Sequence, residues 1–133
     1  MKKVIASGDA PEAVGPYSQA ILAGGFLFCA GQIPLEPKTG QLVAGDIREQ
    51  TARCLENLRA VLTEAGLGFF QVVKTTVFLT DLADFAAMNE VYAKYFSEFP
   101  PARSTIQVAA LPRGSRVEIE AIAASTEATA QEA

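Results

Sequence analysis

Apolar residues recur at helical spacing in two segments of the chain. At the start of the first segment, Asp46 and Glu49 form a capping-box pattern. Gly66, at its end, is typical of the residue that follows a helix. The apolar stripe between these signals consists of Ile47, Thr51, Cys54, Leu55, Leu58, Val61, Leu62 and Ala65. The pattern predicts an amphipathic helix that packs on a flat surface.

A second helix is predicted between a turn at residues 81–84 and the helix-ending pair Pro100 and Pro101. Its apolar face consists of Phe85, Met88, Tyr92, Tyr95 and Phe96.

Shorter segments have the composition or alternation of β-strands. They are residues 4–6, 19–23, 26–31 and 72–80. A loop rich in proline and glycine, residues 32–45, precedes the first helix. With two further strands at the C-terminal end, this order predicts an α+β domain in which a mixed sheet has two helices packed on one face. The other face would be apolar and uncovered, which favours a cyclic homo-oligomer.

The two C-terminal strands carry the most informative polar residues. Arg103 and Thr105 share one face of the first strand, and Glu118 and Glu120 share one face of the second. Proline and glycine between the strands predict a hairpin in which Arg103 lies opposite Glu120. Arginine binds carboxylates in a bidentate manner and glutamate can orient or deprotonate water, so the pair fits a site for a small anionic substrate. A cross-strand salt bridge explains the same pattern.

Composition narrows the possible functions. The 133 residues fit one domain, predicted at residues 1–124, followed by a mobile tail at 125–133. A formal charge of −4 and the absence of basic runs argue against a nucleic-acid partner. No segment matches a signal peptide or a membrane helix, so we expect a cytoplasmic protein without a membrane partner.

The chain has no histidine, which removes the commonest general base and the commonest metal ligand. Cys29 and Cys54 fall in apolar patterns and are interpreted as buried reduced thiols. No glycine-rich nucleotide-binding motif is present. The sequence therefore predicts neither a metal site nor an organic cofactor.

Three residues do not fit their surroundings. Asn89 falls in the apolar stripe of the second helix, where an amide needs hydrogen-bond partners. Tyr17 follows the rigid turn Gly15-Pro16, and Gly31 ends a strand with its backbone open to a neighbour. Each has a structural explanation. Asn89 can be a buried amide with hydrogen-bond partners, Tyr17 can pack in the core or at an interface, and a turn can require Gly31. Contact with a ligand is the alternative explanation for each.

The chain resembles the Rid family, also called YjgF, in five segments that occur in the family's order: GPYSQA, AGQIPLEPKTGQL, VVKTTVFLTDLADFAAMNEVYAKYF, PARS and VEIEAIA. The resemblance extends from Ile5 to Ala123. It implies a chorismate-mutase-like fold and a homotrimer built around a central β-barrel, with clefts between adjacent subunits.

The same resemblance implies hydrolysis of 2-imino acids, and of their 2-aminoacrylate enamine tautomers, to 2-keto acids and ammonium, without a metal or organic cofactor. Arg103 in PARS matches the family's carboxylate-binding arginine, and Glu120, the second glutamate of VEIEAIA, matches its water-orienting glutamate. The implied substrate-binding residues are Tyr17, Gly31, Asn89 and Thr105. Thr105 stands where many members have cysteine, a change that bears on substrate preference more than on activity.

Three other functions are compatible with the sequence. The Arg103 pocket could hold a keto acid or an amino acid as a sensor, without turnover. RNA cleavage or translation inhibition is assigned to some relatives, but the acidic composition argues against it. A structural or chaperone-like trimer predicts that substitutions at Arg103 and Glu120 change only stability.

Overall fold

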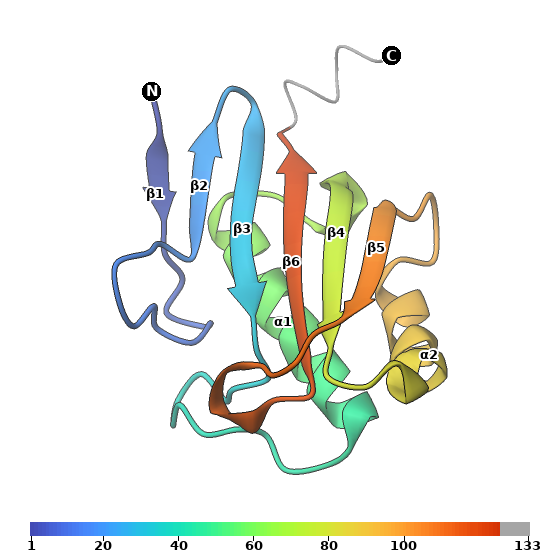
Figure 1. Ribbon diagram of the computed structural model, residues 1–133. Helices are drawn as coiled ribbons and strands as arrows, with labels where there is room; N and C mark the ends of the chain where they lie inside the picture. The colour runs from blue at the N-terminus through green and yellow to red at the C-terminus, as the bar shows by residue number, and fades with distance from the viewer. Residues whose placement is uncertain (126–133) are drawn as a thin grey trace.

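One six-stranded sheet organises the part of the chain that the computed structural model describes, residues 1–125 (Figure 1). The strands are β1 (Lys3–Ile5), β2 (Ala20–Ala23), β3 (Phe26–Gln32), β4 (Val72–Leu79), β5 (Ala102–Gln107) and β6 (Val117–Ala124). The α-helices are α1 (Ile47–Glu64) and α2 (Phe85–Tyr95). The strand order is β1-β2-β3-β6-β4-β5, with β4 and β5 parallel and the other neighbours antiparallel. The predicted α+β class and order of elements are confirmed.

Local sequence signals set the ends of α1. The Asp46 carboxylate accepts hydrogen bonds from the backbone N–H groups of Arg48 and Glu49, at 2.9 and 3.5 Å. Glu49 Oε2 accepts in return from the Asp46 N–H at 2.9 Å, so the predicted capping box is formed. Gly66 follows the helix with a φ of 75°, a conformation that glycine adopts without strain.

Both helices lie on the same side of the sheet: α1 lies behind the strands in Figure 1, and α2 packs against α1 at the edge formed by β5. The inner face of α1 packs against β3 and β6. It is completely buried at Cys54, Leu55, Leu58, Val61 and Leu62. Burial of each large apolar side chain contributes about 1.5–3 kcal/mol, so this contact stabilises the fold substantially. The prediction that two helices cover one face is confirmed.

No helix among residues 1–125 covers the opposite face of the sheet, which faces the viewer in Figure 1. Its large apolar side chains that remain well exposed are Val4, Phe26, Phe28 and Ile106. Exposed apolar faces of this kind are usually covered by association with another chain. We call this surface the open face.

The predicted C-terminal hairpin is wrong. β5 pairs in parallel with one edge of β4, and β6 pairs antiparallel with the other edge, so β4 lies between them. The chain passes from β4 through α2 to β5, and a crossover of this type joins parallel strands. Residues 108–116 then carry the chain past β4 to β6. Val77 and Leu79 of β4 are completely buried, as expected for a strand with neighbours on both edges.

A buried amide that the sequence analysis did not single out holds the long loop between β3 and α1. Asn57 on α1 is completely buried. Its Nδ2 donates to the carbonyl oxygens of Ile33 and Leu35, at 3.3 and 3.0 Å. Within the loop, an isolated β-bridge joins Leu35 to Leu42. The amide therefore fixes the path of the chain as it leaves β3.

We expect Asn57→Leu to destabilise the protein, because two carbonyl groups lose their donor in a buried position. An unsatisfied buried polar group typically costs about 1–3 kcal/mol. The midpoint of urea unfolding, compared at equal protein concentration, measures the loss. Glu64→Gln, at the exposed C-terminal end of the same helix, is the control. Equal midpoints for the two variants would show that the amide does not hold the loop.

Most of the predicted tail, residues 125–133, lies outside the described residues, which end at Ser125. Over residues 1–125, no helix has both the length and the hydropathy needed to cross a membrane. The same residues contain no group of three or more His, Cys, Asp or Glu side chains placed to hold a metal ion.

Candidate functional site

Arg103 lies on the edge strand β5, and its side chain reaches α2 on the helix-covered side of the sheet. Its Nη1 donates to Asn89 Oδ1 at 2.8 Å. Its Cζ lies 4.6 Å from the centre of the Tyr92 ring and 5.4 Å from that of Phe85. Residues 85, 89 and 92 share one face of α2 because they follow the i, i+4, i+7 spacing. One helix face thus supplies an amide and two aromatic rings to a single guanidinium.

The guanidinium keeps donors for a ligand. Within residues 1–125, the hydrogen bond to Asn89 occupies Nη1, while Nε and Nη2 of Arg103 have no partner. These two nitrogens form an edge that matches the two oxygens of a carboxylate. Thr105 lies two residues further along the same strand face, and its buried hydroxyl has no hydrogen-bond partner in the described part of the chain. The edge of β5 therefore presents unused polar groups suited to a small anion.

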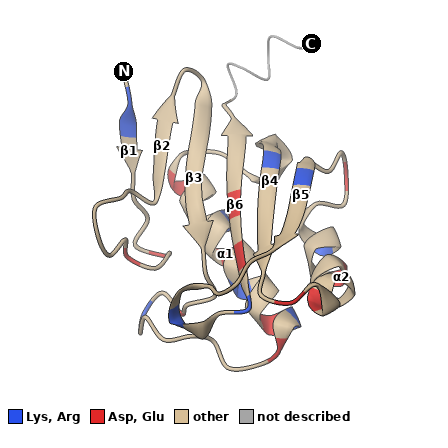
Figure 2. Cartoon of the chain, viewed as in Figure 1, with Lys and Arg blue, Asp and Glu red and all other residues tan. Residues whose placement is uncertain are grey.

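Arg103 and Glu120 lie on opposite faces of the sheet. Arg103 is paired with Thr75 of β4, which is completely buried beneath the helices. Glu120 is paired with the next residue, Thr76, and is exposed on the open face. Figure 2 shows the basic band on β5 and the acidic bands on β6 with β4 between them. Within one chain, the predicted pairing of Arg103 with Glu120 is wrong, and so is the alternative of a cross-strand salt bridge.

Glu118 is the carboxyl group that lies against Gly31. A Cβ atom added to Gly31 would overlap Glu118 Oε2 and would stand 2.8 and 2.9 Å from its Cδ and Cγ. The glutamate is half-buried on the open face, and this burial, together with the neighbouring Glu120 carboxylate, raises the pKa of Glu118. The strand alternation predicts that the two glutamates share a face, and the family resemblance implies that Glu120 orients the water. The close approach to Gly31 distinguishes them, and alternation along the strand carries no sign of it.

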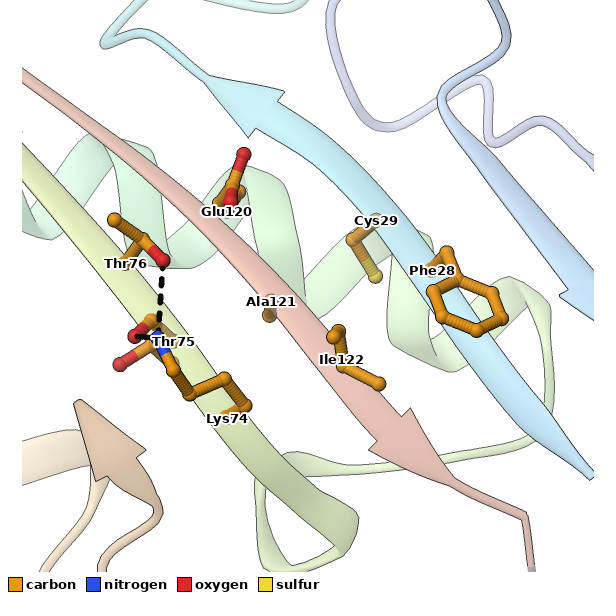
Figure 3. Close-up of a pocket in the computed structure, with 8 residues that line it drawn as sticks. All are labelled: Phe28, Cys29, Lys74, Thr75, Thr76, Glu120, Ala121 and Ile122. Atoms are coloured by element: carbon orange, nitrogen blue, oxygen red, sulfur yellow. Dashed lines mark hydrogen bonds between the residues drawn. The ribbon is translucent and has the colours of Figure 1, made fainter. Parts of the chain in front are cut away.

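Glu120 instead lines a shallow depression of about 370 Å³ on the open face (Figure 3). The side chains around it include Phe28, Lys74, Thr76 and Ile122. Lys74 Nζ donates to the carbonyl oxygen of Thr75 at 2.8 Å and to Thr76 Oγ1 at 3.1 Å, which directs the ammonium along β4. Glu120 is therefore set in a different environment from Glu118, with a lysine on the adjacent strand.

Tyr17 is more than half exposed, in the loop that precedes β2. The loop is held by Gln19, whose Oε1 accepts from the Ser7 N–H at 2.6 Å and whose Nε2 donates to the Pro11 carbonyl oxygen at 2.8 Å. Three strands, β3, β6 and β4, separate β2 from β5. Tyr17 and Arg103 thus belong to opposite ends of the sheet.

The structure brings only some of the predicted site residues together. Arg103, Asn89 and Thr105 form one group at the edge of β5, which we call the arginine edge. Gly31 lies with Glu118, while Glu120 and Tyr17 lie in two further places. A single chain therefore holds the parts of the predicted site without assembling them.

The chain matches the model of the Endoribonuclease L-PSP family, which describes the Rid or YjgF proteins, over residues 7–125. The chain belongs to the Rid family. A RutC family protein of Pyrococcus horikoshii is 57% identical over 123 residues, which cover 92% of this chain and 98% of that protein. The 2-iminobutanoate/2-iminopropanoate deaminase of Homo sapiens is 49% identical over 123 residues, covering 92% and 90% of the two chains.

Solved Rid structures share the fold. The crystal structure of Escherichia coli TdcF with bound serine has a TM-score of 0.89 and 45% sequence identity, and the alignment covers 93% of this chain and 99% of that one. The architecture expected from the sequence motifs is thus that of the Rid proteins.

Close contact at Gly31 gives this Rid chain a sensitive position for mutation. We expect Gly31→Ala to displace the Glu118 carboxyl, because the added methyl group occupies the space of its outer atoms. If the chain has the activity for which the human relative is named, its rate on a 2-imino acid generated in solution should fall by about 10-fold or more, while the unfolding midpoint changes little. Gly68→Ala is the control, since a Cβ at Gly68 meets nothing within 4 Å. Full activity of Gly31→Ala would exclude a role for this contact.

Proposed function

We propose that this protein hydrolyses 2-imino acids and 2-aminoacrylate-type enamines to 2-keto acids and ammonium. The observation that carries the proposal is the arginine edge, where Arg103 keeps two donors free for a carboxylate beside the unpaired hydroxyl of Thr105. Mammalian relatives of about 50% identity are named as 2-iminobutanoate/2-iminopropanoate deaminases, which supports the same activity here. Removal of reactive imines would protect other metabolites and proteins from damage.

The site is proposed to form between subunits of a homotrimer. Arg103 and Glu118 lie on opposite faces of the sheet, so one chain cannot direct both at the same substrate. A second copy that covers the open face would bring its arginine edge toward the Glu118 and Gly31 of its neighbour. A closed ring of three, with the open faces turned inward as a barrel, covers every apolar face and leaves none for further growth.

Mixed assemblies test this arrangement. If each site takes Arg103 from one copy and Glu118 from the next, inactive Arg103→Ala and Glu118→Gln chains should restore activity when they are assembled together. Random mixing at equal amounts should give about one quarter of the wild-type sites. Native mass spectrometry reports the trimer. No recovery from mixed trimers would contradict the shared site.

The proposed reaction follows from the charges. Nε and Nη2 of Arg103 hold the substrate carboxylate, with the Thr105 hydroxyl beside them. Glu118, rather than the Glu120 expected from the sequence, holds a water molecule over the imine carbon beside the Gly31 backbone. The water oxygen adds to C2, and one of its protons passes through the carboxylate to nitrogen, which gives a carbinolamine. The carboxylate then carries the hydroxyl proton to nitrogen, the C–N electron pair leaves with ammonia, the C=O bond forms, and a keto acid remains.

This chemistry needs little activation of the substrate. An imine carbon is already electrophilic, so positioning and one proton carrier suffice, and neither a histidine nor a cofactor is required. Cys29 is unsuited to act as a nucleophile, since burial raises the pKa of its thiol to about 12. Water is therefore the proposed nucleophile.

The direct test follows imine decay and ammonium release. A 2-imino acid is generated in the cuvette by an amino-acid oxidase or lyase, and its disappearance is recorded with and without the protein. Acceleration across several side-chain sizes gives the substrate preference. The absence of acceleration for every imine would overturn the proposed function.

Small-carboxylate binding without turnover is a second candidate, favoured by the serine bound to the E. coli relative. In that case, a keto or amino acid raises the unfolding temperature while no ammonium is released. RNA cleavage, after which the family model is named, has no comparable support, because the chain carries a charge of −4 and no histidine.

A further inference from the structure

We infer that Tyr92 is a positioning residue for Arg103, in that its ring and its hydroxyl together fix the plane of the guanidinium that receives the substrate carboxylate. This inference rests on the proposed function, because it concerns the same arginine. The sequence places Tyr92 on the apolar face of α2, where it reads as a core residue. Its contacts indicate a second role, in the placement of Arg103.

The hydroxyl of Tyr92 ties α2 to the strand beside Arg103. Tyr92 is only 5% exposed, and its hydroxyl shares a hydrogen bond of 2.6 Å with Thr75 Oγ1. Thr75 is completely buried and is the β4 residue paired directly with Arg103. Burial raises the pKa of Tyr92, so the phenol stays protonated and retains this bond at physiological pH. The anchor of the ring thus lies beside the backbone of the arginine that the ring contacts.

Aromatic packing restrains the ring itself. The ring centres of Tyr92 and Phe96 lie 4.6 Å apart, and Phe69 packs edge-on against Phe96 at 5.2 Å. A tyrosine side chain has two main torsions, and this packing restrains both while the hydroxyl fixes the far end of the ring. The face of the ring is therefore a fixed surface, 4.6 Å from Arg103 Cζ.

Two restraints then define the position of the guanidinium. The Asn89 amide holds Nη1 by a hydrogen bond, which limits rotation within the plane. The Tyr92 ring faces Cζ and limits tilting out of the plane. With Nη1 engaged, Nε and Nη2 remain directed at a carboxylate in one orientation.

The restraints leave the charge of Arg103 available. In the described part of the chain, its partners are an amide and aromatic rings, and none of the ion pairs there includes it. A carboxylate partner would hold the guanidinium equally well, but it would compete with the substrate for the charge. Support by neutral groups gives both a fixed orientation and an uncompensated cation, which suits an anionic substrate.

Two substitutions separate the contributions of the ring and the hydroxyl. Tyr92→Leu removes the aromatic face, and we expect it to raise KM for a 2-imino acid by about 10-fold, with a smaller change in kcat. Tyr92→Phe keeps the ring and releases its anchor, so a rise of about threefold is expected; Thr75→Val should match it. Tyr95→Phe is the control, because Tyr95 also donates its hydroxyl, to Glu56, and lies 5.5 Å from Arg59 Cζ.

The decisive measurement repeats these substitutions in an Arg103→Ala background. If Tyr92 acts through Arg103, Tyr92→Phe and Tyr92→Leu should cause no further rise in KM there. An equal rise in both backgrounds would make Tyr92 purely structural and overturn the inference. If Tyr92→Leu does not assemble, the same comparison is made with Tyr92→Phe and Thr75→Val, which preserve the shape of the side chain.

The two proposals fail in distinguishable ways. The absence of imine hydrolysis by the wild-type protein would overturn the proposed function, and a wild-type KM for Arg103→Ala would remove the arginine edge from the substrate site. A raised KM for Arg103→Ala, together with a wild-type KM for every Tyr92 variant, would overturn only the role of Tyr92 in positioning Arg103.

Discussion

Arg103→Ala is expected to lower kcat/KM for 2-imino acids by about 100-fold or more. Loss of one partner from a hydrogen-bonded charge pair typically costs about 2–5 kcal/mol, and here the lost partner would hold the substrate carboxylate at two points. Much of the loss should appear in KM, because the carboxylate is bound equally in the ground state and the transition state. A smaller loss in kcat reports poorer alignment of the imine carbon with the water.

Two further variants make this result specific. Arg103→Lys keeps the charge but loses the planar fork, so we expect only partial recovery. Arg113→Ala removes an exposed arginine from the turn Pro112–Gly114, outside the strand and the helix that form the arginine edge, and should leave the kinetics unchanged. Native mass spectrometry confirms assembly of each variant. Wild-type hydrolysis by an assembled Arg103→Ala protein would show that the arginine edge is not the substrate site.

The elements of this fold could be predicted because their signals are local. Asp46 and Glu49 reveal the start of α1 within four residues of each other, and the buried stripe follows from its spacing. The partner of a strand carries no such signal. A turn rich in proline and glycine joins β5 to β6, yet β4 lies between them because α2 returns the chain in a parallel crossover. The predicted hairpin failed at this point.

Part of the site could be predicted because some of its residues also carry local sequence signals. Asn89 was identified as an amide in an apolar stripe, and it is the residue that holds Arg103. Tyr92 was read as core because a buried aromatic on a helix face is ordinarily no more than that. The proposed choice of Glu118 over Glu120 could not be made from the sequence, since both occupy the same face of β6 and only the approach to Gly31 distinguishes them.

Glu118→Gln is the second substitution expected to have a large effect. Glutamine keeps the size of the side chain but cannot carry the proton of the attacking water, and loss of a positioned general base typically costs about 10²–10⁴-fold. We expect kcat to fall by about 100-fold while KM changes little, because the carboxylate of the substrate stays bound to Arg103. Glu120→Gln, two residues away on the same face, is the matched control and should remain within about threefold of the wild type. Steady-state kinetics of both assembled variants measure the difference.

The pH profile distinguishes the two carboxyl groups further. The pKa of Glu118 is raised first by burial and then by the charge of Glu120, so the acid needs a higher pH to ionise than an ordinary glutamate. If the carboxylate form is active, kcat/KM rises with pH through this pKa. Removal of the neighbouring charge in Glu120→Gln lowers the pKa, and the acid limb of the profile should move to lower pH while the plateau is retained. Loss of the plateau in Glu120→Gln but not in Glu118→Gln would instead assign the water to Glu120, the residue that the family resemblance implies, in the depression beside Lys74.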